Sequence, residues 1–394
     1  MARRKHFAGM SADDPAAAMA EVDRLVGLGQ FAPAAALLEA ALNGGAASMA
    51  GWLQLAGLRR ALKQPHRALE AVHAALALSP LDFMGLVMQA GLLESLGDSG
   101  AGEAWAQALA QRPPGALPPP LAAAVAAGEL ARDAWIGQRE ARMAEAAAPA
   151  EQAASADQAW RIARFRSNVL RKSRAFHSEP THFHYPGLVE REFHPRQHFP
   201  WLAELEAATG QIREELRAIM SSDRAELTPY IQYQAHEALA QWQPLNHNRD
   251  WTAIHLLNHG MPVERNAAQC PATMAALARL PQPRIPGASP NAMFSLLAPH
   301  TSIPAHVGVN NARLVCHLPL MVPEGCWFRV GGETRRWQEG EAFVFDDTIE
   351  HEAANPTGQL RVVLIFDVWH PDVSPLEREA VAAMIAAVDG SSPL

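Results

Sequence analysis

The stretch Arg313-Leu-Val-Cys-His-Leu-Pro-Leu-Met-Val-Pro-Glu-Gly-Cys-Trp-Phe-Arg-Val-Gly-Gly-Glu-Thr-Arg-Arg-Trp337 decides the fold of the second part of the chain. Short apolar and β-branched runs alternate in it with turn residues, and its Gly-Gly pair is a typical hairpin turn. Similar runs follow at residues 342–345 and 360–369. Many short strands joined by short turns predict an antiparallel sandwich or a double-sheet jelly roll.

The first part of the chain carries an internal repeat. Segments with the same pattern begin at Leu28, Leu62 and Leu96, so the pattern recurs every 34 residues. Each unit predicts a helix, a tight turn at Gly or Pro, and a second helix with a stripe of alanines that permits close packing. The period and this layout resemble tetratricopeptide repeats, and we expect a helical array over residues 1–115. Its concave groove would bind a peptide or protein partner; an array that only supports the next domain is the alternative.

Composition changes twice after the repeats. Residues 116–158 are rich in Ala and Pro with scattered charge, which predicts a helical linker. Residues 159–394 contain more aromatic residues and histidines, followed by the short strands described above. We therefore expect an α+β protein of two domains, in which a helical array precedes a β-rich domain.

Bulk properties exclude several classes of function. The formal charge of -8 is spread without long runs of one sign, so we expect no nucleic acid partner. The basic start is not followed by the apolar segment that a signal peptide needs, and no later segment is apolar for long enough to span a membrane. We therefore expect a cytoplasmic protein with no membrane partner. The three cysteines, Cys270, Cys316 and Cys326, lack CxxC spacing, which argues against a disulfide framework and a zinc knuckle.

Polar residues share one face of the strand predicted at residues 313–321. Strand alternation places Arg313, Val315 and His317 on that face, opposite to an apolar face. An arginine and a histidine inside a barrel are costly to bury without an acid, so we expect a carboxylate ligand there. Arg361, at the head of an apolar run, repeats this situation.

Two histidines are candidate metal ligands. His306 follows Pro304 and precedes a glycine turn, while His351 follows a predicted strand end and a turn, so both are expected at strand edges. Two neutral histidines from separate strand edges suit Fe(II), Zn or Cu, and open coordination positions favour oxygen chemistry at iron. The usual iron site adds a carboxylate two residues after the first histidine, and that position is Gly308 here.

Five motifs occur in order along the second part of the chain: His306-x-Gly, Asn311-x-Arg313-Leu-x-x-His317-Leu, Gly332-Glu-x-Arg-x-Trp-x-x-Gly340-Glu, Phe345-Asp-Asp-x-x-Glu-His351-Glu and Phe366-Asp-Val-Trp-His-Pro. Through these motifs residues 160–394, and most closely 290–376, resemble the aspartyl/asparaginyl β-hydroxylase family of Fe(II)/2-oxoglutarate oxygenases. The resemblance implies a double-stranded β-helix, which is a cupin-like jelly roll, and an iron held by two histidines without the carboxylate. His306 and His351 match those ligands, and Gly308 agrees with the missing carboxylate.

The same resemblance implies where 2-oxoglutarate, the cosubstrate, would bind. Ser295 and Arg361 match the residues that hold its distal carboxylate. His317 would lie near the end of the molecule that chelates iron. Trp251 matches a tryptophan that lines the cosubstrate pocket.

The resemblance also implies where the prime substrate would lie. Arg313 is expected to face that substrate. The animal enzymes have a second arginine where this chain has Val315, so either Arg313 takes over part of its task or the inner carboxylate of the oxoacid is held less tightly. Asp346 and Asp347 are expected to cap the turn or to orient His351, and we expect no catalytic residue beyond the iron ligands.

The implied chemistry uses O2 to decarboxylate 2-oxoglutarate to succinate and CO2, coupled to hydroxylation of an unactivated C–H bond. The first hypothesis is a hydroxylase that acts on the β-carbon of an Asp or Asn side chain in a peptide or protein. The second keeps the chemistry and changes the substrate to a free amino acid, small metabolite or lipid. The third is a repeat-based adaptor with a degenerate, non-catalytic oxygenase domain. The complete set of matched site residues favours catalysis, whereas Val315 keeps the third hypothesis open.

Overall fold

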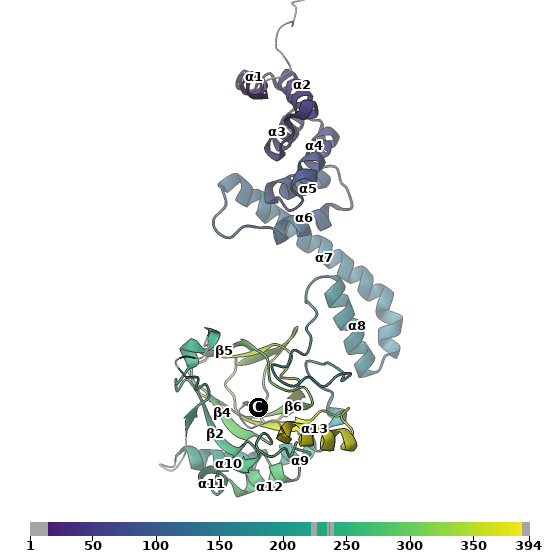
Figure 1. The fold of residues 1–394 in the computed structure, drawn as a ribbon. Coiled ribbons are helices and arrows are strands. Elements are labelled where there is room, and N and C mark those ends of the chain that lie inside the picture. Colours follow the sequence, from purple (N-terminus) through teal and green to yellow (C-terminus); the bar gives the residue numbers. More distant parts are fainter. Residues whose placement is uncertain (1–14, 222–226, 235, 237–239, 388–394) are drawn as a thin grey trace, which may run out of the picture. The chain divides into compact units, whose positions relative to one another are not determined.

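The computed structural model describes residues 15–221, 227–234, 236 and 240–387 (Figure 1). The chain divides into two compact units, Met1–Leu170 and Arg171–Leu394, and each is described by itself. The basic start, which the sequence does not predict to be a signal peptide, lies outside the described residues. The domain bounds 1–115, 116–158 and 159–394 remain predictions. Within the described residues, no helix is both long and apolar enough to cross a bilayer.

Six helices of the first unit form three antiparallel hairpins. In each hairpin the two helices meet at one of the three repeat starts, Leu28, Leu62 or Leu96. The helices are α1 (Pro15–Gly27), α2 (Phe31–Ala41), α3 (Met49–Ala61), α4 (Pro65–Leu78), α5 (Phe83–Ser95) and α6 (Ala101–Ala110).

The turns within the three hairpins are built alike. The second residue of each repeat, Gly29, Lys63 or Gly97, has a left-handed backbone with φ of 70°, 57° or 67°. Its N–H donates to the carbonyl three residues back, and the next N–H donates to the carbonyl five residues back. This pair of bonds ends the first helix of each hairpin with a Schellman motif, which usually has glycine at the left-handed position. The recurrence confirms the predicted helical repeat in three dimensions.

The long helix α7 (Pro119–Ala153) packs against the third hairpin. Two glycines allow this close approach, because a Cβ atom on Gly102 of α6 would lie 2.2 Å from the ring of Trp135, and one on Gly128 of α7 would lie 2.2 Å from the ring of Trp105. Helix α8 (Ala156–Val169) follows, and the boundary between the units falls at Leu170.

Two antiparallel sheets form the second unit. The larger runs in the order β1-β2-β4-β11-β6-β9, with β3 paired to β2, and the smaller runs β5-β10-β7-β8. The larger sheet contains β1 (Thr228–Pro229), β2 (Trp251–Asn258), β3 (Met261–Pro262), β4 (Ala292–Leu297), β6 (Arg313–Met321), β9 (Phe343–Phe345) and β11 (Arg361–Trp369). The smaller contains β5 (Thr301–His306), β7 (Trp327–Val330), β8 (Glu333–Arg335) and β10 (His351–Asn355).

Opposite faces of the larger sheet bury different partners. One face, with Leu314, Cys316 and Leu318, packs on helices that lie beneath the sheet in Figure 1. The other face, which includes Val315, packs on residues of the smaller sheet such as Phe328. The predicted alternation of side chains between two faces of β6 is therefore present. The face that contains Val315 borders the space between the sheets. The covering helices are α9 (Leu202–Ala207), α10 (Thr209–Met220) and α12 (Pro271–Ala278).

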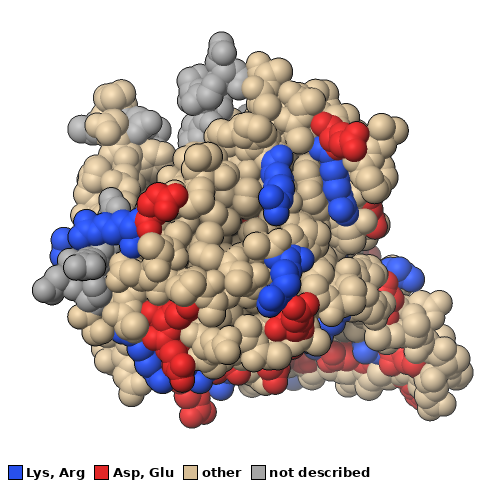
Figure 2. All heavy atoms as spheres, turned by 90° about the horizontal axis from the view of Figure 1, so that it is seen from below, with Lys and Arg blue, Asp and Glu red and all other residues tan. Residues whose placement is uncertain are grey.

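Shorter elements complete the second unit. Helix α13 (Pro375–Ala387) packs its Val381 and Ile385 on Trp369 at the end of β11. Helix α11 (Glu264–Ala267) and two 3-10 turns, Arg196–His198 and Ala240–Leu245, lie in connections. On the face shown in Figure 2, basic and acidic side chains are intermixed and broad uncharged areas separate them.

Candidate active site

His306 and His351 face each other across two paired strands. They are the last residue of β5 and the first of β10, and they are direct partners in the antiparallel register. Their ring centroids lie 4.0 Å apart. The structure therefore brings together the two predicted metal ligands, which are 45 residues apart in the sequence (351 minus 306).

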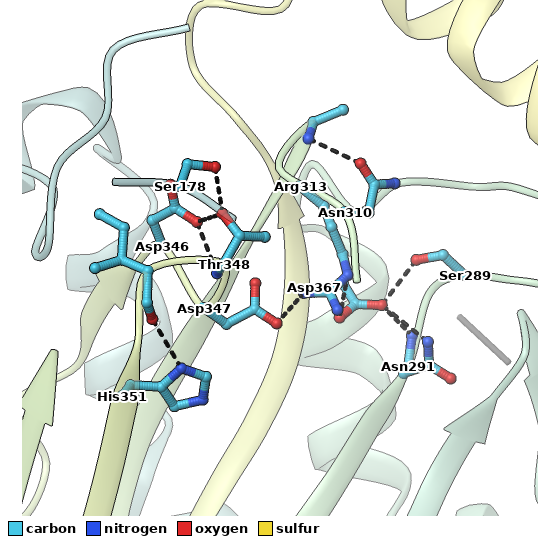
Figure 3. Close-up of polar contacts among 12 residues, drawn as sticks. Ser178, Ser289, Asn291, Asn310, Arg313, Asp346, Asp347, Thr348, His351 and Asp367 are labelled. Atoms are coloured by element: carbon cyan, nitrogen blue, oxygen red, sulfur yellow. Dashed lines mark hydrogen bonds and ion pairs between the residues drawn. The ribbon is translucent and has the colours of Figure 1, made fainter. Parts of the chain in front are cut away.

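The two imidazoles are held in the same way by backbone carbonyls. His306 Nδ1 lies 2.8 Å from the carbonyl oxygen of Pro304, and His351 Nδ1 lies 3.1 Å from that of Ile349 (Figure 3 shows the second bond). A carbonyl only accepts, so each Nδ1 carries the proton and donates it. The Nε2 atom of each ring is then the nitrogen that can ligate a metal.

Both rings are neutral at ordinary pH. Burial lowers the pKa of His306, and burial together with the nearby His306 ring lowers the pKa of His351 well below its ordinary value. Neutral imidazole is the form that binds a metal, so burial prepares the pair for that role.

In the described part of the chain, no third His, Cys, Asp or Glu joins this pair to form a metal-binding group. The position two residues after His306 is Gly308, whose N–H donates to the carbonyl of Asp347 at 2.6 Å. The Asp347 side chain bonds instead to Arg313, and Asp346 bonds to Thr348. The donor set is thus two histidine nitrogens, which leaves coordination positions open for other ligands.

Arg361, the first residue of β11, is a buried cation whose guanidinium lies 5.0 Å from the ring centroid of Trp337. Its side chain is 2% exposed, its Nη1 lies 3.2 Å from both Oγ and the carbonyl oxygen of Ser295, and its Nε has no hydrogen-bond partner. Burial lowers the pKa of its guanidinium to about 10, which still leaves it charged at neutral pH. Among the described residues, no carboxylate forms an ion pair with it. A buried charge without a partner is costly, so the site fits an acidic ligand.

Ser295 and Trp251 complete this end of the pocket. The indole N–H of Trp251 donates to Ser295 Oγ at 3.1 Å, and the two residues lie on the neighbouring strands β2 and β4. Because Ser295 Oγ is shared with Arg361, three of the four predicted cosubstrate residues form one hydrogen-bonded group.

His317 lies in an aromatic pocket on β6. The indole N–H of Trp337 donates to its Nδ1 at 3.3 Å, so a neutral His317 carries its proton on Nε2 and can donate it to a ligand. Burial and the Arg361 guanidinium lower the pKa of His317 well below its ordinary value. His317 is thus a neutral donor beside a charged one, an arrangement suited to an oxoacid.

Arg313, the predicted substrate residue, is engaged with two buried aspartates. Its Nη1 donates to Asp347 Oδ2 at 3.0 Å and its Nε lies 3.6 Å from Asp367 Oδ1 (Figure 3). Asp367 is held in turn by Ser289 and Asn291. The structure places Arg313 in an ion-pair network, with the apolar Val315 next on the same face.

Two aromatic residues near the histidines were not predicted from the sequence. The ring of Trp242 lies 5.0 Å from that of His306, and Tyr230 stacks on Trp251 with centroids 3.8 Å apart. The clustering of Tyr and Trp between residues 230 and 251 is the feature of the sequence that could have pointed to these two residues. Together these rings form an apolar wall on the His306 side of the site.

The fold and the site define a class: a protein with a two-histidine candidate metal centre and a buried arginine pocket between two antiparallel sheets. Residues 206–371 match the model of the family described as Aspartyl/Asparaginyl beta-hydroxylase. This part of the chain is thus similar to a family that is described by its hydroxylase activity.

Similar proteins come from animals and bacteria. The chain is 39% identical over 140 residues to human "Aspartate beta-hydroxylase domain-containing protein 2", covering 35% of this chain and 38% of that protein. It is 36% identical over 193 residues to "Ornithine lipid ester-linked acyl 2-hydroxylase" of Rhizobium tropici, covering 48% of this chain and 64% of that protein. Human "Aspartyl/asparaginyl beta-hydroxylase" is 33% identical over 148 residues, which cover 37% of this chain and 19% of that protein. The chain thus spans less than two thirds of each of these relatives.

Solved structures similar to the chain include PcrH from Pseudomonas aeruginosa, with 20% identity and a TM-score of 0.27 over 32% of this chain and 95% of that chain. A TPR domain is similar with 16% identity and a TM-score of 0.29, over 40% of this chain and 41% of that chain.

Proposed function

We propose that this protein is an Fe(II)- and 2-oxoglutarate-dependent dioxygenase that hydroxylates a C–H bond. The single observation that carries the proposal is Arg361, a buried guanidinium that lacks an acidic partner among the described residues. Arg361 shares a face of β11 with Val363, which belongs to the core between the sheets. Phe328 and Phe345 of the same core lie beside the ring of His351. A dicarboxylate that chelates a metal through one end would neutralise Arg361 with the other.

Each residue of the site has a role in this proposal. His306 and His351 would hold the iron through Nε2, while Arg361 and the Ser295 hydroxyl would bind the distal carboxylate of 2-oxoglutarate. His317 would donate a hydrogen bond from Nε2 to the end near the metal. When bound, the iron with O2 supplies the oxidising chemistry that converts 2-oxoglutarate to succinate and CO2 and hydroxylates the substrate.

The rings around the pocket would exclude water from it. Trp251 and Trp242 lie on one side, and Phe328 and Phe345 contact His317 and His351 on the other. Exclusion of water strengthens the attraction between Arg361 and a carboxylate, because fewer solvent dipoles screen it.

We propose that the two sheets form a double-stranded β-helix, the cupin-like jelly roll. Support comes from the antiparallel pairing within both sheets and from the core that fills the space between them. The histidines at the ends of β5 and β10 then lie at the mouth of the barrel.

The first candidate substrate is an Asp or Asn side chain in a peptide or protein, hydroxylated at its β-carbon. The names of the family and of the human relatives support it. The helical repeats of the first unit would provide a groove for such a chain.

A second candidate substrate, an acyl chain of a lipid, is favoured by a specific observation. Arg313 already has two carboxylate partners, Asp347 and Asp367, and Val315 beside it is apolar. The part of the pocket expected to face the substrate therefore offers little free positive charge for an acidic side chain. The name of the Rhizobium relative describes an acyl 2-hydroxylase.

The test supplies the full-length chain with Fe(II), 2-oxoglutarate and 18O2, and offers either a library of Asp- and Asn-containing peptides or a set of acylated lipids. Mass spectrometry then detects a single added 18O atom. Label on a β-carbon of Asp or Asn supports the first candidate, and label on an acyl chain supports the second. Stoichiometric succinate without label in any offered substrate would leave the chemistry intact and reject both substrates.

A further inference from the structure

A segment upstream of the family match crosses both histidine-bearing parts of the site. Residues 176–185, here called the strap, lie outside residues 206–371 that match the family model. The strap runs over two short segments, residues 307–311 that follow His306 and residues 346–350 that precede His351. It has no part in the function proposed above.

The turn at residues 346–349 contacts both histidine segments. Its Ile349 carbonyl accepts the Nδ1–H of His351, and its Asp347 carbonyl accepts the N–H of Gly308, two residues beyond His306. A movement of this turn would therefore change the direction of the His351 ring and the path of the chain after His306 together.

Thr348 is the centre of this turn and is fully buried. Its N–H and its hydroxyl both donate to Asp346 Oδ1 (Figure 3). A hydroxyl has one proton, so the short 2.6 Å contact between Thr348 Oγ1 and Ser178 Oγ is made by the Ser178 hydroxyl as donor. Ser178 lies on the strap, and this bond closes a chain of hydroxyls from the strap to Asp346.

The strap backbone bonds to the same two segments within a few residues. The N–H of Glu179 donates to the Thr348 carbonyl at 2.8 Å, and the N–H of Thr181 donates to the Gly308 carbonyl at 3.0 Å. Phe183 N–H then donates to the Val309 carbonyl at 2.9 Å. One short segment thus links the turn before His351 to the segment after His306.

Both ends of the strap are anchored. At the start, the Phe176 ring lies beneath the guanidinium groups of Arg174 and Arg329, at 4.3 and 5.7 Å, and both arginines pair with Glu350. At the end, Tyr185 and Asn311 exchange two hydrogen bonds, from the Tyr185 N–H at 2.6 Å and the Asn311 amide at 2.9 Å. Anchors on either side leave the middle of the strap in a fixed position over the site.

We infer that Ser178 is a positioning residue: its bond to Thr348 sets the turn that orients His351 relative to His306, and so tunes the affinity for iron. This inference rests on the proposed function. Groups that orient metal ligands from outside typically change metal affinity by about 10- to 100-fold when removed. Ser178 acts through one further residue, so we expect an effect of about 10-fold on the dissociation constant of Fe(II).

Two substitutions remove the link and two keep it. Ser178→Ala deletes the donor, and Thr348→Val deletes the central hydroxyl together with its bond to Asp346. Thr348→Ser keeps the hydroxyl and loses only a methyl group. Ser302→Ala is the matched control, because Ser302 is exposed and lies on β5, the strand that carries His306.

The measurement is an anaerobic titration of the full chain with Fe(II) in the presence of 2-oxoglutarate, followed by the visible charge-transfer absorption of the complex. We expect Ser178→Ala and Thr348→Val to bind Fe(II) about 10-fold more weakly, with a shifted band, whereas Thr348→Ser and Ser302→Ala bind like the unaltered chain. A residue that only supports the fold would lower the unfolding temperature and leave the affinity of the folded protein unchanged.

Equal Fe(II) affinity and an unshifted band in Ser178→Ala and Thr348→Val would overturn the inference while leaving the proposed function intact. Failure of the unaltered chain to bind Fe(II) would instead overturn the proposed function, and the inference with it. If Ser178→Ala does not fold, Ser178→Cys takes its place in the same titration, because a thiol is only a weak donor to Thr348 and leaves the bond from Thr348 to Asp346 intact.

Discussion

A Cβ atom on Gly308 would lie 2.2 Å from Oδ2 of Asp347. The Asp347 carboxylate is buried and held by Arg313 at 3.0 Å, so it cannot move aside without breaking an ion pair. The space in which a third iron ligand would start at position 308 is therefore filled by another acid. The missing carboxylate is thus built into the packing around the histidine pair.

Restoring an acid at this position should harm the site. We expect Gly308→Asp to weaken Fe(II) binding by at least about 10-fold, because its side chain displaces Asp347 and disturbs the turn before His351. Anaerobic Fe(II) titration measures this. The double variant Gly308→Asp with Asp347→Ala relieves the clash and should recover part of the loss. Tighter binding by the single variant would show that the space can accept a third ligand.

Removing the buried guanidinium of Arg361 should abolish the binding of 2-oxoglutarate without lowering the stability of the ligand-free protein. We expect Arg361→Met to leave the free energy of unfolding unchanged or higher in the absence of ligand, since the charge lacks an acidic partner among the described residues. At 2-oxoglutarate concentrations about 100 times the dissociation constant, the unaltered chain should gain about 2.7 kcal/mol, and the variant should gain nothing.

Urea unfolding without ligand gives the free energy of unfolding of each variant. The same measurement with 2-oxoglutarate and a redox-inert divalent metal gives the stabilisation by the ligand. Arg361→Lys is the control, because it keeps a charge and loses the planar fork of the guanidinium. Equal stabilisation of Arg361→Met and the unaltered chain by 2-oxoglutarate would remove Arg361 from the pocket.

The backbone of the first unit is strained at Lys63, and a substitution there should relieve the strain. This residue occupies the left-handed position that Gly29 and Gly97 fill in the other two repeats, with φ of 57°. We expect Lys63→Gly to raise the free energy of unfolding of the first unit by about 0.5–1 kcal/mol, because glycine adopts this conformation without a Cβ clash. Thermal unfolding of Lys63→Ala tests the cause. Alanine removes the charge and keeps the strain, so an equal gain from both variants would contradict the explanation.

Acid should destabilise the second unit in part through His194. Burial and the nearby His370 ring lower the pKa of His194 from 6.5 to about 3. In the unfolded chain the His194 ring takes up a proton below pH 6.5, whereas in the folded chain it does so only near pH 3. The free energy of unfolding therefore falls as the pH falls from 6.5 to about 3. We expect His194→Gln to reduce the slope of unfolding free energy against pH by roughly 1 kcal/mol per pH unit between about pH 6 and 4.

Denaturant unfolding across this pH range measures that slope. His184→Gln is the matched control, because His184 is an exposed histidine of the same unit. Identical slopes for the two variants would show that His194 does not contribute to acid sensitivity.

The sequence predicted the strands that have strong β patterns and missed those that depend on partners. Residues 313–321 form β6 as expected, and β11 begins one residue after the predicted start at 360. The histidine strands were expected only as strand edges and turns. β5 contains Pro304, and β10 reads His-Glu-Ala-Ala-Asn, so neither has much intrinsic preference for a strand. Pairing of β10 between β5 and β7 makes both of them strands.

The candidate site likewise contains some features that local sequence patterns predict and others that they do not. Alternation along β6 predicted which side chains share a face, because that depends only on neighbours in the sequence. The bond from Ser178 to Thr348 spans 170 residues, and no local pattern signals such a contact. The engagement of Arg313 with two aspartates likewise depends on loops that approach only in the folded chain.

Succinate release tests the iron assignment most directly. The full chain is loaded with Fe(II) and 2-oxoglutarate without oxygen and is then exposed to O2, beside His306→Ala and His351→Ala treated identically. We predict that the unaltered chain releases succinate in proportion to the loaded iron and that each variant releases only the background of a protein-free mixture. Release of as much succinate by the two variants as by the unaltered chain would contradict the two-histidine iron site.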